Sequence, residues 1–180
     1  MRSIRKFAIF AIILSLAGCG GEERVYAPPS KPARQHAAPP PRGPAVSDAT
    51  FVAENGSIDL FVIRSSELAL QRSSSSRVRD FATTMINGHK GTSGQLSLAG
   101  RRLNLLPSAK LLPGDQAMLD GLQSSSQFDA DYVRDQRAVH QRAIRLDTSY
   151  AASGGSPTLR PVAKAALPIE QRHLRLLAYL

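Results

Sequence analysis

Apolar side chains recur every three or four residues through most of residues 48–180, and this helical period decides the fold class. Runs in which β-branched and polar residues alternate are scarce, so the pattern does not predict strands. Each apolar stripe has to pack against other helices. Residues 48–180 are therefore predicted to form one all-α domain, an antiparallel four-helix bundle. The expected helices span 49–71, 76–103, 126–153 and 156–177.

The connections predict where the helices start and stop. Ser47 or Asp48, Ser76 and Ser126 are expected to cap the first three helices. Only a short helical turn, at 116–122, is expected between the second and third. Ser156-Pro157 is a start signal for the last helix, in which Pro168 predicts a kink.

Residues 19–47 have a composition that cannot build a core. Seven prolines fall in this stretch, among alanine, arginine and glutamine. Such a segment is predicted to be disordered and to favour extended polyproline II. The favoured interpretation is a spacer, and the alternative is a ligand for a proline-binding groove or for peptidoglycan.

Residues 1–18 have the layout of an export signal. A basic start is followed by about ten mainly apolar residues, too few to span a bilayer, which needs about 20. The sequence Leu16-Ala17-Gly18-Cys19 resembles the lipobox of bacterial lipoproteins. That resemblance implies cleavage before Cys19 and acylation of its thiol and amine, including by palmitate. Because Gly20 is not an aspartate, it implies a periplasmic lipoprotein of the outer rather than the inner membrane.

The basic charge then has a simple interpretation. The formal net charge of +9 falls to +6 when the signal peptide is removed, and the remaining arginines lie mainly on polar helix faces. The expected partner is the lipid bilayer, contacted through Cys19. Anionic envelope polymers are a further candidate. Nucleic acid is excluded by the compartment and by the lack of tryptophan.

Histidines on the apolar stripes are the only candidates for chemistry. His89, His140 and His173 belong to three different helices, and Glu54 is on the core-facing side of the first. Imidazole and carboxylate groups on facing helices are how bundles bind divalent transition metals. His89 and His140 are expected near mid-height, and His173 and Glu54 nearer one end. Hydrogen-bonded core histidines without a metal are the simpler interpretation.

Glu170-x-x-His173 has the spacing of one ligand pair of a di-iron carboxylate bundle. Such a centre needs a second pair, but Ile86 and Arg137 occupy the matching positions before the other two histidines. A di-iron centre is therefore not predicted. No nucleophile elbow occurs either, so no residue is proposed as catalytic and an enzyme is not favoured.

Several motifs together resemble the domain of unknown function 4142 family. They are Phe51-Val52, Val78-Arg79-Asp80-Phe81-Ala82-x-x-Met85-Ile86-x-x-His89, Leu106-Pro107, Phe128-Asp129-x-x-Tyr132-Val133-x-x-Gln136-x-x-x-His140 and Leu167-Pro168-x-x-x-x-His173-Leu174. The resemblance implies an exported, ferritin-like helical bundle without an established activity. It implies that the three histidines act together. The family tends to have an apolar residue at position 170, so the resemblance implies that the Glu170-x-x-His173 spacing is incidental. It also implies an acidic residue at position 88, where this chain has glycine.

Three functions remain open from the sequence, one of which is binding of anionic envelope polymers through the arginine-bearing helix faces. The favoured one is a membrane-anchored bundle with an interaction or envelope-stress role and no bound cofactor. The alternative is a metal-binding or redox bundle that uses His89, His140, His173 and Glu54.

Overall fold

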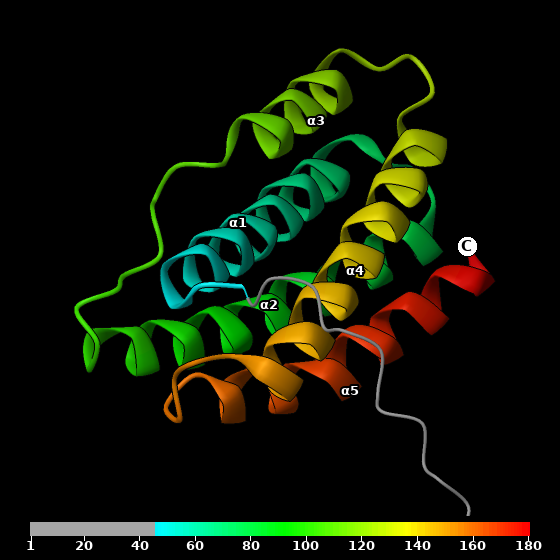
Figure 1. Cartoon of the computed structure of the whole chain (residues 1–180). Coiled ribbons are helices and arrows are strands. Elements are labelled where there is room, and N and C mark those ends of the chain that lie inside the picture. Colours follow the sequence, from blue (N-terminus) through cyan, green and yellow to red (C-terminus); the bar gives the residue numbers. More distant parts are fainter. Residues whose placement is uncertain (1–45) are drawn as a thin grey trace, which may run out of the picture. The chain divides into compact units, whose positions relative to one another are not determined.

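The computed structural model describes residues 46–180, in which all regular structure is helical (Figure 1). The elements are α1 (Asp48–Arg72), α2 (Ser76–Arg101), α3 (Pro113–Ser124), α4 (Phe128–Ser153), α5 (Arg160–Leu176) and the 3-10 helix η1 (Leu177–Tyr179). The predicted all-α fold class is confirmed. None of the helices within 46–180 is long and apolar enough to cross a membrane. The predictions for the signal peptide, Cys19 and most of the 19–47 tether lie outside the described residues.

Four long helices form the bundle as two antiparallel hairpins, α1–α2 and α4–α5. In the packed domain α1 also contacts α4, and α2 contacts α5. The connection between the hairpins runs back along the whole bundle, as in ferritin-like folds (Figure 1). The short turn expected at 116–122 was an underestimate, because α3 is a 12-residue helix that packs on α1 and α4.

Several helix boundaries differ from the prediction by a few residues. Ser47 caps α1 as expected, but Ser75 rather than Ser76 accepts the capping hydrogen bond of α2. Helix α4 begins at Phe128 without a side-chain cap, so the cap predicted at Ser126 was wrong. Ser156 does accept from the backbone of the two residues before α5, although the helix itself begins only at Arg160.

The core consists of the predicted apolar stripes. Its largest fully buried side chains include Phe51, Ile58, Phe61, Met85, Leu96, Leu122, Tyr132, Tyr150, Leu159 and Leu177. Burying each of these contributes about 1.5–3 kcal/mol relative to exposure. Phe51 stacks on Tyr150 with ring centroids 3.9 Å apart, which joins α1 to α4 at one end of the bundle.

Helix α3 is attached to the bundle through polar contacts at both ends. Near its start, the buried Asp115 accepts hydrogen bonds from Ser57 of α1 and Arg142 of α4, each 2.5 Å long. At its end, Arg72 of α1 donates to the carbonyl oxygens of Leu122, Gln123 and Ser125. Carbonyl groups at the end of a helix lack the usual intrahelical partners, and the guanidinium group of Arg72 supplies donors to them.

Candidate metal centre

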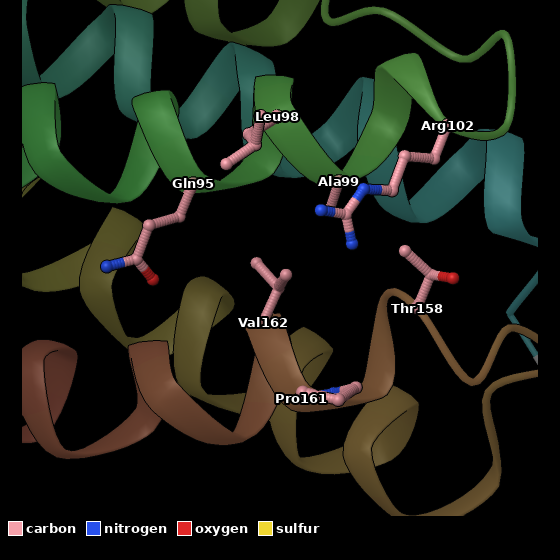
Figure 2. A pocket seen from close by; sticks show the side chains of 7 residues that line it. All are labelled: Gln95, Leu98, Ala99, Arg102, Thr158, Pro161 and Val162. Carbon is pink, nitrogen blue, oxygen red and sulfur yellow. The ribbon is translucent and has the colours of Figure 1, made fainter.

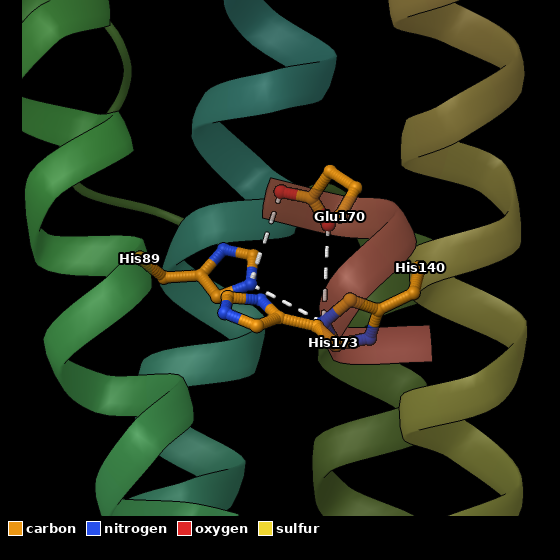
Figure 3. Close-up of side chains that lie close together, drawn as sticks. All are labelled: His89, His140, Glu170 and His173. Atoms are coloured by element: carbon orange, nitrogen blue, oxygen red, sulfur yellow. Dashed lines mark hydrogen bonds and ion pairs between the residues drawn. The ribbon is translucent and has the colours of Figure 1, made fainter. Parts of the chain in front are cut away.

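Three histidines and a glutamate from three helices meet in the bundle interior (Figure 3). They are His89 of α2, His140 of α4, and Glu170 and His173 of α5, and one nitrogen or oxygen of each lies within 4.8 Å of the corresponding atom of every other. The imidazoles of His89 and His140 have no solvent exposure, and Glu170 and His173 are 3% and 2% exposed. The four side chains thus form a buried cluster, called the histidine cluster below.

Helix lengths explain why these side chains lie at one height. His140 lies 13 residues before the last residue of α4, and His173 lies 13 residues after the first residue of the antiparallel α5. His89 lies 12 residues before the last residue of α2, and α2 ends at the same end of the bundle as α4. At about 1.5 Å of rise per residue, all three lie about 18–20 Å from that end.

Three expectations about the cluster need correction. His173 does not lie nearer one end than His89 and His140, because α5 begins three residues later than Pro157, the predicted start. Glu170 is not incidental, because one helical turn places it beside His173 in the core. The structure does not bring Glu54 to the cluster: this half-buried side chain lines a surface pocket with Asp115 and Arg142.

Hydrogen bonds orient two of the imidazoles. Nδ1 of His89 lies 2.8 Å from Oδ1 of Asp59, which also accepts from Thr92. Nδ1 of His140 lies 2.6 Å from the carbonyl oxygen of Gln136, which can only accept. His140 therefore donates through Nδ1–H and carries its lone pair on Nε2, and His89 does the same when Asp59 is ionised. The two Nε2 atoms lie 3.3 Å apart, so in that state their lone pairs face each other and a cation between them would be stabilised.

The other two members also have free acceptor atoms. Nδ1 of His173 and Oε2 of Glu170 are buried and have no hydrogen-bond partner. Glu170 contacts both fixed imidazoles, with oxygens 3.9 Å from Nε2 of His89 and 3.8 Å from Nε2 of His140. Unpartnered buried polar atoms are rare in folded proteins, and a bound ion would satisfy these two.

Burial keeps the histidine cluster uncharged. Desolvation lowers the pKa of His89, His140 and His173 to about 3 each, with smaller effects of neighbouring histidines on the latter two. Burial and then the charges of Asp59 and Asp147 raise the pKa of Glu170 to about 9. At neutral pH the metal-free cluster therefore has three neutral imidazoles and a protonated carboxyl group.

Three neutral imidazoles and one carboxyl form a donor set that suits divalent transition metals. Two nitrogens bound at about 2.0–2.1 Å to one tetrahedral ion lie about 3.3–3.4 Å apart, which is the distance between the two Nε2 atoms. The Nδ1–H donors to Asp59 and Gln136 match the outer hydrogen bonds that orient metal-binding histidines. The residues of the cluster therefore fit a metal ion.

The sequence interpretation missed two carboxyl groups next to the cluster. Asp59 of α1 and Asp147 of α4 are buried, and burial raises the pKa of each to about 7. The available signal was spacing: Asp147 follows His140 by two helical turns, and Asp59 interrupts the apolar stripe of α1 beside Ile58. Polar residues at core positions, rather than histidines alone, would have identified them.

A second hollow lies on the surface between α2 and the start of α5 (Figure 2). Its volume is about 270 Å³, and it is lined by Gln95, Leu98, Ala99, Arg102, Thr158, Pro161 and Val162. It contains no histidine or carboxyl group, so the candidate chemistry belongs to the buried cluster.

The sequence profile described as "Domain of unknown function (DUF4142)" matches residues 31–180. The chain belongs to the DUF4142 family. No functionally curated protein matches this DUF4142 sequence.

Solved structures share the fold of the DUF4142 domain at low sequence identity. CopM in its Cu(II)-bound form has a TM-score of 0.64 and 15% identity, covering 76% of this chain and 96% of CopM. A DUF305 fragment from Deinococcus radiodurans has a TM-score of 0.63 and 16% identity, covering 75% and 96%. CopM in its Cu(I)-bound form has a TM-score of 0.62 and 14% identity, covering 74% and 94%. These neighbours support the helical-bundle fold.

Proposed function

We propose that this DUF4142 protein binds one divalent transition metal ion through His89, His140, Glu170 and His173. The observation that carries the proposal is the convergence of four buried ligand atoms within 4.8 Å of one another, with the Nε2 atoms of His89 and His140 3.3 Å apart. A cation between these two nitrogens is coordinated by both. It also ionises Glu170, whose carboxylate neutralises part of the metal charge in the core. The geometry thus favours the metal-binding function over the interaction role that the sequence favoured.

The burial of all four ligands indicates the kind of metal protein. Sites closed by four protein ligands hold a metal, whereas catalytic sites keep a position open for water or substrate. A bound ion would link α2, α4 and α5, because its ligands come from all three helices. We therefore propose retention or transfer of the metal rather than hydrolysis. Because CopM of the same fold is known with Cu(II) and Cu(I), copper belongs among the ions to test beside zinc and iron.

The test is the metal content of the full chain purified without a histidine tag. We expect close to one equivalent of metal by elemental analysis. After removal by a chelator, we expect one equivalent of added Zn²⁺, Cu²⁺ or Fe²⁺ to bind again. A chain that stays metal-free at saturating concentrations of all three ions contradicts the proposal.

Gly88 provides a more specific test, because it makes room for the third imidazole. A Cβ atom at this position would lie 2.6 Å from Cε1 and 2.9 Å from Nε2 of His173. Gly88→Ala is therefore expected to displace His173 and to weaken metal binding about tenfold, equivalent to about 1.4 kcal/mol. Competition with a chelating dye measures this change.

Gly91→Ala is the matched control, one turn along the same helix. A Cβ atom there meets nothing within 4 Å, and Gly91 is exposed. Metal affinity should remain unchanged, while the free energy of unfolding rises by about 0.5–1 kcal/mol from helix propensity. Equal metal affinities for the two variants would argue against His173 as a ligand.

We further propose that acylated Cys19 holds this domain at the periplasmic face of the outer membrane. The proposal is supported by the sequence of residues 1–18, which is typical of an export signal, and by glycine rather than aspartate directly after Cys19. Cys19→Ser is expected to move the protein from the membrane to the soluble fraction, and Gly20→Asp to move it to the inner membrane. Fractionation followed by immunoblotting measures both, and unchanged partitioning of Cys19→Ser would rule out the anchor.

A further inference from the structure

A small, partly enclosed cavity lies directly beside the histidine cluster, and part of its wall consists of polar side chains. Its polar wall consists of Asn55, Asp59, Thr92, Asp147 and Glu170, and the remaining wall is apolar. The volume is about 20 Å³, enough for one water-sized particle. Glu170 belongs to both the cavity and the histidine cluster.

The three carboxyl groups of this cavity lack basic partners. Within residues 46–180, no lysine or arginine forms a salt bridge with Asp59, Asp147 or Glu170, although these side chains are only 5%, 1% and 3% exposed. Buried carboxylates are normally paired with a cation or bound to a metal. Their mutual repulsion contributes to raising the pKa of Asp147 and Glu170.

Protonation alone leaves these groups incompletely satisfied. Oδ1 of Asp147 accepts from Asn55 at 3.1 Å, but Oδ2 is buried without a partner. Oε2 of Glu170 is in the same state. A proton on Oδ2 of Asp147 would be a buried donor without an acceptor, whereas a cation in the cavity would satisfy this oxygen.

We propose that this cavity is a second cation site, in which Asp59, Asp147 and Glu170 hold a hard divalent ion beside the histidine cluster. Carboxylate and amide oxygens select ions such as Mn²⁺ or Mg²⁺, whereas the imidazoles of the first site select softer ions. Asn55, at the cavity wall, orients Asp147 by donating its amide N–H to Oδ1 of that carboxyl group. The shared Glu170 carboxylate links the two ions, and Asp59 links the second ion to His89 through the Nδ1–H bond.

The experiment uses the full chain, stripped of metal and loaded with one equivalent of Zn²⁺ to fill the histidine cluster. Mn²⁺ is then titrated, and free Mn²⁺ is counted from its electron paramagnetic resonance signal. We expect one further Mn²⁺ to bind. In Asp147→Asn, which keeps the size of the side chain and its acceptor for Asn55, we expect at least tenfold weaker Mn²⁺ binding with the zinc equivalent unchanged.

Asp120→Asn is the matched control, because it removes the same charge from an exposed position on α3. Its Mn²⁺ affinity should equal that of the parent chain. The proposal is overturned if the zinc-loaded chain binds no Mn²⁺, which would indicate a water-filled cavity, or if Asp147→Asn binds Mn²⁺ as tightly as the parent. Retained zinc and helical circular dichroism show that the variant is folded. If the parent chain binds Mn²⁺ but binds no zinc, the proposed function is refuted, whereas the second cation site is still supported.

Discussion

The variant in which His89, His140 and His173 are all replaced by alanine is expected to bind no metal at the histidine cluster. It loses every imidazole of the site and retains only Glu170, which is insufficient to hold a transition metal in a protein core. We expect the metal content to fall from about one equivalent to below a tenth, equivalent to at least about 1.4 kcal/mol of lost affinity. Elemental analysis of untagged protein measures the change.

Two further variants make this result specific. His36→Ala removes the one histidine outside the described residues and should leave the metal equivalent intact. Glu170→Gln removes one ligand charge with little change in volume, so it tests the site if the triple variant proves too unstable to purify. If Glu170→Gln and the triple variant both retain a full equivalent, the metal is bound elsewhere in the chain.

Metal affinity is expected to rise about tenfold per pH unit between pH 7 and 8.5. Above pH 4 the three imidazoles are already neutral, because burial lowers the pKa of each to about 3, so protons do not compete for them. Glu170 still carries a proton in this range, because burial raises its pKa to about 9. Metal binding must displace that one proton, and one displaced proton gives a tenfold change per pH unit.

Below pH 7 the dependence should become steeper. Asp59 and Asp147, whose pKa burial raises to about 7, then also carry protons that a nearby cation displaces. Chelator competition across the pH range measures the slope, and calorimetry in two buffers counts the released protons. Glu170→Gln should flatten the profile above pH 7. A parent chain with a flat profile above pH 7 would show that Glu170 is not a ligand.

The apolar periodicity was sufficient to predict the four long helices and most of the core. It also identified the three histidines as core-facing, because each lies on an apolar stripe. It did not predict their common height, which depends on where α5 begins. Ser156 does accept capping hydrogen bonds, but it caps a turn that precedes α5. The helix therefore begins three residues later than predicted, which changes the expected height of His173 by about 4.5 Å.

The carboxyl side of the site was harder to predict for a different reason. Charged residues on a stripe edge are usually solvated, and Glu54 and Glu170 look alike in the sequence. What separates them is packing: α3 and its connection leave Glu54 in a surface pocket, whereas α5 turns Glu170 toward α2 and α4. Tertiary contacts of this kind are not encoded in the period of a single helix.

The division of the bundle into two hairpins has a consequence for how metal enters and leaves. Each hairpin is local in sequence, so it can form early during folding, while the docking of one hairpin on the other is the slow, long-range step. His89 belongs to the first hairpin, whereas His140, Glu170 and His173 belong to the second. A metal ion at the histidine cluster therefore links the two hairpins. The rate at which the ion dissociates is expected to depend on how often the hairpins separate.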